Sequence, residues 1–262
     1  LGIDAKVGDV VEIEVTPQDF GRIAAQTAKQ VIMQRIKEAE RDLVYAEFIE
    51  REGEIITGII SKREGNNIIV DLGRAEGLLP SNEQISNENY RPGGRMKFYI
   101  VEVKKTSKGS RIVLSRTHPG LVRRLFELEI PEVHDGLVDI RAIAREPGVR
   151  SKVVVESRSE KIDPVGSCIG NRGTRVKNIT DELRGEKIDI IRWSSDTRVL
   201  IAEALSPAHV AKVELDEATN TARVFVPQDQ LSLAIGKDGQ NARLAARVTG
   251  WRIDIKGEKD GE

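Results

Sequence analysis

The sequence has little cysteine and histidine, and each shortage excludes a class of site. Its 262 residues include one cysteine, Cys168, which excludes an internal disulfide and a thiolate metal site. A single thiol among apolar neighbours predicts a packed side chain and fits a reducing, cytoplasmic location. The three histidines, at positions 118, 134 and 209, lack the spacing of a metal site. No metal ion or other cofactor is therefore expected.

Long apolar runs and enzyme motifs are also missing. No run approaches the roughly 20 residues that cross a bilayer, and no secretory signal precedes the first expected strand, so no membrane partner is predicted. The sequence contains neither a Gly-Lys-Ser/Thr phosphate loop nor a Gly-x-Ser-x-Gly elbow. We therefore predict no catalytic residue and no enzymatic activity. Because the chain begins with Leu1, we expect it to be part of a longer protein.

A short glycine motif, by contrast, occurs twice. Residues 169–173 read Ile-Gly-Asn-Arg-Gly and residues 235–239 read Ile-Gly-Lys-Asp-Gly, each followed by a helix-like run. Each copy ends in a related phrase, at 185–190 and 250–255. Repetition at this period predicts two copies of one small module.

The composition of this motif favours binding to a phosphate chain. Two glycines three residues apart allow a polyanion to approach the backbone, and the helix that follows directs unpaired N–H groups at it. An isolated Gly-x-x-Gly is more often a structural turn, but two copies in one context favour the clamp with which KH domains hold single-stranded RNA. The candidate RNA-binding residues here are Gly170, Asn171, Arg172, Gly173, Arg175, Lys177, Gly236, Lys237, Asp238, Gly239, Gln240, Asn241 and Arg243.

The surroundings of each motif predict an α-β-β-α-α-β unit. The first has helices at 121–130, 165–169 and 174–183 and strands at 138–144, 152–156 and 188–191. Leu121, Leu125 and Leu128 are expected on one face of its first helix. The second has helices at 197–205, 229–235 and 240–249 and strands at 209–215, 221–226 and 251–255. Trp193 and Trp251 are expected to pack in the cores.

Before these units, five short strands predict a closed barrel. They are expected at 55–60, 68–72, 77–80, 96–103 and 111–115, with a turn at 108–109. This pattern is similar to the S1-type OB-fold. Where such barrels usually carry aromatics for base stacking, this chain has aliphatic residues, and only 4% of all its residues are aromatic. We therefore predict mainly electrostatic contacts to RNA, through Lys104, Lys105, Lys108 and Arg111.

Charge is unevenly distributed along the chain. The net charge is −1, yet residues 91–124 hold ten Lys or Arg against one acid, and residues 125–140 hold five acids and no base. Such segregation predicts either a positive surface or an ordinary solvated face. Ahead of the barrel, we expect a strand at 10–15 and a helix over about 20–50 that acts as a strut. Acids outnumber bases in residues 1–50, so RNA is not the expected partner of this segment.

One barrel followed by two KH modules resembles the NusA family of bacterial transcription elongation and termination factors. The phrases at 19–30, 142–148 and 231–246 carry the resemblance most specifically. It implies an α+β protein with the end of a polymerase-binding domain and a connector helix (1–50), an OB barrel (51–117) and prokaryotic-type KH domains (118–195 and 196–262). It further implies binding to single-stranded nascent RNA and to RNA polymerase, and control of pausing, termination and antitermination. Other elongation factors are possible partners, and a monomer is expected.

Two alternatives use similar modules. A ribosome-assembly or other general RNA-binding protein would share the folds but do a different job. A phosphorolytic exoribonuclease would carry one KH and one OB module, in that order, behind a large catalytic core, and this chain has neither that order nor that core.

Overall fold

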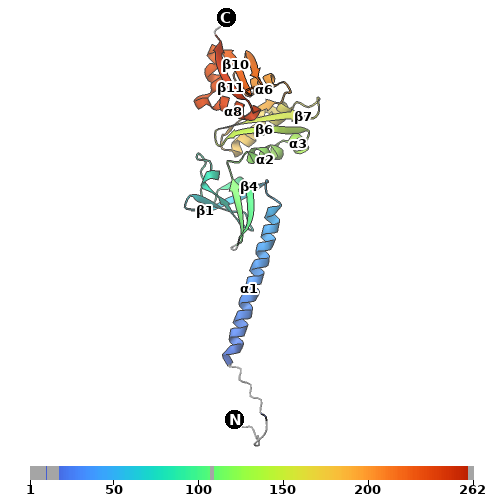
Figure 1. Cartoon of the computed structure of the whole chain (residues 1–262). Helices are drawn as coiled ribbons and strands as arrows, with labels where there is room; N and C mark the ends of the chain where they lie inside the picture. The colour runs from blue at the N-terminus through green and yellow to red at the C-terminus, as the bar shows by residue number, and fades with distance from the viewer. Residues whose placement is uncertain (1–9, 11–17, 107–108, 259–262) are drawn as a thin grey trace.

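The computed structural model describes residues 10, 18–106 and 109–258. Figure 1 shows a rod-like helix, a barrel and two α+β units, arranged one after another in chain order. The predicted barrel and both repeated units are confirmed. The strand expected at 10–15 lies outside the described residues except for its first position, as does residue 108 of the expected turn.

Helix α1 (Gln18–Ile49) is a strut of 32 residues, about 48 Å long at 1.5 Å per residue. Only its C-terminal end is anchored: Phe48 is 1% exposed and belongs to the barrel core, which Val44 and Tyr45 help to cover. Apolar residues nearer its start, such as Ile23, remain exposed, and the helix projects away from the barrel (Figure 1). Among the described helices, none combines the length and apolar character that a membrane crossing requires.

The barrel consists of β1 (Ile55–Glu64), β2 (Asn67–Asp71), β3 (Glu76–Leu79), β4 (Arg95–Thr106) and β5 (Gly109–Ser115). The strands close in the order β1-β2-β3-β5-β4, and only the β3–β5 pair is parallel. Alternation along β4 places Phe98 inside, fully buried, and Tyr99 outside, where its ring stacks on His118 at 4.5 Å. Register shifts in β1 and β4 mark the bulges at which these strands curve around the barrel.

The first KH domain contains α2 (Pro119–Glu129), α3 (Pro131–His134), β6 (Val138–Glu146), β7 (Arg150–Ser157), α4 (Pro164–Ile169), α5 (Thr174–Glu182) and β8 (Lys187–Arg192). Its sheet has the order β6-β7-β8, with β8 parallel to β7. Leu121 and Leu125 of α2 are buried, whereas Leu128, expected on the same face, is 60% exposed. The helix also buries Val122 and Phe126, each next in sequence to one of the two buried leucines.

The second KH domain repeats this order with α6 (Thr197–Ala204), β9 (Lys212–Asp216), β10 (Thr221–Pro227), α7 (Leu231–Ile235), α8 (Gln240–Thr249) and β11 (Arg252–Glu258). Its sheet has the order β11-β10-β9. The N-terminal helix here is a single element, whereas the first domain adds the short α3 after α2.

One face of the first KH domain's sheet contributes to the hydrophobic core of the second KH domain. Val154 and Ile191, on the sheet of the first domain, are buried in the cluster that includes Leu244 of α8. In the parallel strand pair of the second domain, Phe225 and Lys256 occupy the register positions that Val154 and Ile191 occupy in the first. The Lys212 ammonium lies 5.8 Å from the centre of the Phe225 ring. One sheet face is therefore apolar and covered, whereas the matching positions of the second sheet are an aromatic residue and a lysine.

Candidate nucleic-acid interface

Two loops, which we name the first clamp (170–173) and the second clamp (236–239), have the same backbone conformation. Gly170 has φ 74° and ψ 177°, and Gly236 has φ 76° and ψ 171°. Gly173 has φ 75° and ψ 16°, and Gly239 has φ 72° and ψ 13°. The third position of each clamp is also left-handed, at φ 54° and 52°. The sequence repeat thus encodes one three-dimensional motif used twice.

The two glycines of each clamp have different roles. A Cβ on Gly170 would lie 2.7 Å from Cγ of Arg175, and one on Gly236 would lie 2.9 Å from the backbone nitrogen of Asn241. The first glycine is therefore required by close packing of the next helix. A Cβ on either second glycine would meet no atom within 4 Å, so the backbone there is open to a ligand.

Helices α5 and α8 start directly after the clamps, and neither has a side-chain cap at its N-terminus. The N–H of Thr174 already donates to the carbonyl of Asn171, and the N–H of Gln240 donates to that of Lys237. What the start of each helix offers to an anion is therefore the positive end of the helix dipole. The middle residues of the clamps, Asn171 and Arg172 in the first and Lys237 and Asp238 in the second, are all exposed. Neither clamp is covered by another domain, which is the condition that RNA binding requires.

The residue five positions after the first glycine holds each clamp together. Arg175 donates 2.7 Å hydrogen bonds to Glu132 of α3 and to the carbonyl of Ser167. In the second clamp, Asn241 donates from its amide to the carbonyls of Leu205 and Ala234. Asn241 is only 1% exposed, so its predicted RNA contact is wrong: the amide satisfies buried carbonyls instead. The half-buried Arg175 likewise uses its guanidinium to stabilise its own clamp.

Other predicted residues differ in how open they are. Lys177, on the outer side of α5, is exposed. Arg243, the matching residue of α8, forms an ion pair with Glu146 at 2.6 Å, and Gln240 donates to the same carboxylate at 2.7 Å. The first clamp therefore presents more available positive charge than the second, which also contains Asp238.

Of the four predicted barrel residues, Lys108 lies outside the described residues, and the other three lie at the far end of the barrel from the clamps. The β4–β5 hairpin points along α1, away from the KH domains (Figure 1). There Lys104 pairs with Glu102 at 2.7 Å and Lys105 with Asp42 of α1 at 2.5 Å, while Arg111 is exposed opposite Lys104. The structure thus does not bring these cations together with the clamps.

Comparison with known families decides the relationship. Family models match the chain in sequence: the NusA N-terminal domain at 2–42, the S1 RNA binding domain at 50–116, the NusA-like first KH domain at 116–193 and the NusA-like second KH domain at 197–262. The transcription termination/antitermination protein NusA of Bacillus subtilis (strain 168) is 59% identical over 254 residues, covering 97% of this chain and 68% of that protein. The chain belongs to the NusA family.

Other NusA proteins show the same extent of similarity. The protein of Halalkalibacterium halodurans is 58% identical over 98% of this chain and 67% of its own length. That of Mycobacterium tuberculosis (strain H37Rv) is 50% identical over 95% of this chain and 74% of its own length. These relatives are named as transcription termination/antitermination proteins, which agrees with the prediction that the chain is not an enzyme. Separately, the described residues hold no cluster of three possible metal ligands.

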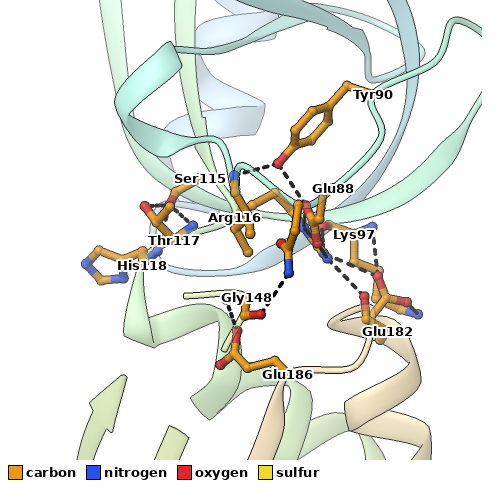
Figure 2. A network of polar contacts seen from close by, with 12 residues as sticks. Glu88, Tyr90, Lys97, Ser115, Arg116, Thr117, His118, Gly148, Glu182 and Glu186 are labelled. Atoms are coloured by element: carbon orange, nitrogen blue, oxygen red, sulfur yellow. Dashed lines mark hydrogen bonds and ion pairs between the residues drawn. The ribbon is translucent and has the colours of Figure 1, made fainter. Parts of the chain in front are cut away.

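A buried ion network joins the barrel of this NusA-family chain to its first KH domain (Figure 2). The Arg116 side chain is fully buried and donates to both oxygens of Glu88 and to the main-chain carbonyls of Lys97, at 2.7 Å, and Glu182, at 2.9 Å. Lys97 forms an ion pair with Glu182 at 3.0 Å. Because every nitrogen of the guanidinium has a partner, the network favours one angle between the two domains.

The turn between β6 and β7 connects all three domains. Its Gly148 carbonyl accepts from Asn87 of the barrel segment, and its backbone N–H donates to Glu186 at 2.8 Å. Arg145, close before the turn, forms a buried ion pair with the same Glu186. Glu146 contacts α8 of the second KH domain through its ion pair with Arg243.

Sequence reasoning missed this junction and misplaced one tryptophan. Part of the basic run 91–124 is used here, since Arg116 is buried and Lys97 is paired, so the run is not one positive surface. A buried arginine needs acidic partners, but Glu88 and Glu182 are far from Arg116 in sequence, so no local pattern indicated the network.

The two tryptophans differ in their surroundings. Trp193 is 36% exposed, with the Arg141 guanidinium 5.6 Å from the centre of its ring, contrary to the expected core packing. Trp251 does pack on the core. Cys168 is buried as predicted.

Proposed function

We propose that this chain binds single-stranded nascent RNA through both KH clamps and, together with RNA polymerase, modulates pausing, termination and antitermination. The observation that carries the proposal is the pair of exposed clamps with one geometry, each at the uncapped N-terminus of a helix. Open glycine backbone and the positive end of a helix dipole suit a phosphate chain of any base sequence.

The way the domains are joined supports binding of one strand at both clamps. The sheet of the first KH domain contributes to the core of the second, and the barrel is fixed to the first of them by the Arg116 network. When two sites are held at a fixed separation, the second contact is intramolecular and raises the overall affinity without any new interaction. The barrel cations add charge at a distance, so their contribution is weak and sensitive to salt.

The partners follow from the same proposal. Nascent RNA would bind the KH domains, while RNA polymerase would bind the N-terminal domain, of which residues 1–50 are the end and the connector. The barrel at 51–117 and the KH domains at 118–195 and 196–262 are the units we assign to RNA. Contact with other elongation factors, action in the cytoplasm and a monomeric state complete the proposal.

Charge reversal at the clamps tests the proposal. Arg172→Asp suits the left-handed backbone, because Asp238 occupies the same conformation in the second clamp. We expect Arg172→Asp and Lys237→Asp each to weaken binding of a labelled single-stranded RNA, measured by fluorescence anisotropy. Arg22→Asp, on the exposed face of α1, changes the charge equally and should leave affinity unchanged. Equal affinities for all four proteins would refute the proposal.

A further inference from the structure

Glu146 is the last residue of β6 in the first KH domain, but its carboxylate binds the second. One oxygen accepts from Nε2 of Gln240 at 2.7 Å and the other from Nε of Arg243 at 2.6 Å. Arg243 also donates from Nη1 to the carbonyl of Asp238 at 3.2 Å. A chain of hydrogen bonds therefore leads from the first domain, through Arg243, to the middle of the second clamp.

The first clamp has no such arrangement. Lys177 and Arg243 occupy equivalent positions, each seven residues after the first glycine of its clamp. Lys177 is exposed and forms no ion pair with any of the described residues, so its ammonium group is available to a phosphate. The guanidinium of Arg243 is already engaged on two sides. These contacts hold Nε and Nη1 and fix the orientation of the side chain, which stays 46% exposed. A phosphate would meet a guanidinium whose charge Glu146 already balances.

The support beneath Glu146 is rigid. The preceding residue, Arg145, is almost fully buried and donates to Glu186 and to the carbonyl of His118 at 2.8 Å. Two residues beyond, Gly148 is held by Glu186 and by Asn87. A carboxylate on such a support can orient a neighbouring side chain, because its own backbone has few alternatives.

Electrostatics keep this carboxylate charged. Hydrogen bonding to Arg243, more than any other cause, lowers the pKa of Glu146 below its usual value, and Gln240 and the charge of Arg247 act in the same direction. The carboxylate also lies beside the first turn of α8, where the helix dipole favours an anion.

We propose that Glu146 is a positioning residue for RNA binding: acting through Arg243, it holds the second clamp in register with the first, and Arg243 itself does not contact RNA. This inference rests on the proposed function. It assigns the two clamps unequal chemistry, with side-chain cations contacting phosphate at the first and mainly backbone N–H groups at the second.

A charge swap across the pair tests this assignment. The proteins to compare are wild type, Glu146→Arg, Arg243→Glu and the double variant, which keeps the net charge of wild type. The measurement is the Kd for a single-stranded RNA of about twelve nucleotides, long enough for two clamps of about four nucleotides each. We expect each single variant to bind about fivefold more weakly, within the range of coupling between contacting residues, and the double variant to recover to within about twofold of wild type.

Two competing roles for these side chains predict the opposite results. If Glu146 only repels RNA, Glu146→Arg will bind more tightly than wild type. If Arg243 contacts phosphate, the double variant will stay as weak as Arg243→Glu. Either result would overturn the inference. Glu146→Gln provides a variant of the same shape that keeps an acceptor for Gln240; it should show a smaller loss than Glu146→Arg, and a loss of equal size also counts against the inference.

A matched control separates this inference from the proposed function. Lys177→Glu makes the same change at the first clamp, where we expect direct phosphate contact, so combining it with Glu146→Arg should give no recovery. If wild type itself does not bind the RNA, the proposed function fails. If wild type binds and Lys177→Glu leaves the Kd unchanged while the swap behaves as expected, the side-chain contact assigned to the first clamp is wrong and the positioning role of Glu146 stands.

Discussion

Removing Arg116 should strongly destabilise the junction between the barrel and the first KH domain. The side chains of Arg116 and Glu88 are both 0% exposed. In Arg116→Ala, the buried Glu88 carboxylate keeps only the hydroxyl of Tyr90, which donates to it at 2.8 Å, and the carbonyls of Lys97 and Glu182 lose a donor. Breaking one partner of a buried pair costs about 3–5 kcal/mol, and we expect a loss of stability in that range.

Two further variants locate the cause of that loss. Arg116→Lys keeps the charge but cannot reach all the acceptors with a fork geometry, so we expect about 1–3 kcal/mol. Replacing the pair together, as Arg116→Met with Glu88→Leu, leaves no buried charge without a partner. That double variant should lose less than Arg116→Ala, since buried pairs exchanged for apolar residues are often neutral.

The assay is urea unfolding followed by far-ultraviolet circular dichroism, with the free energy taken from the linear dependence on denaturant. If Arg116→Ala lowered the free energy of unfolding by less than about 1 kcal/mol, the reasoning would be refuted, because a buried carboxylate without its cation destabilises the folded state by more than that. The same would follow if the apolar double variant were less stable than Arg116→Ala.

Three other outcomes are expected. Burial raises the pKa of the Cys168 thiol to about 12, so Ellman's reagent at pH 8 should label it only after unfolding; rapid labelling of the native protein would contradict this. Burial lowers the pKa of His118, so the unfolded chain binds a proton more readily than the native state. The free energy of unfolding should therefore fall as the pH drops below about 6.5, and the free energy of unfolding of the His118→Gln variant should fall less over the same range. Gly173→Ala, at φ 75°, should cost about 1–2 kcal/mol in thermal melts, and Gly170→Ala more, because its Cβ would also meet Arg175.

The elements of the KH domains could be predicted closely because local signals delimit them. Helix α8 spans 240–249 in both the sequence analysis and the structure, since Gly239 and Gly250 bracket an amphipathic run and both adopt left-handed backbone. The strands of the barrel follow from alternation and turn residues in the same way. Clamp geometry was also foreseeable, because glycine spacing constrains the backbone directly.

Contacts between domains could not be predicted, because the partners are far apart in sequence. The exposed Leu128 has the helical spacing of a core residue, and only the arrangement of the barrel and α3 around α2 decides which face is buried. Asn241 and Arg243 look alike from sequence, as polar residues just after a clamp. The first is buried beneath α6, and the second meets a carboxylate of the neighbouring domain, which no local pattern indicates.

The salt dependence of RNA binding tests the central claim most directly, because it counts phosphate contacts. For single strands, the slope of log K against log salt changes by about 0.7 for each phosphate that a cation neutralises. We predict that Arg172→Asp combined with Lys237→Asp makes the slope shallower by at least about 0.7, the share of the cation at the first clamp, and weakens binding, while Arg22→Asp leaves both unchanged. A slope equal to that of wild type in the double clamp variant would contradict the account.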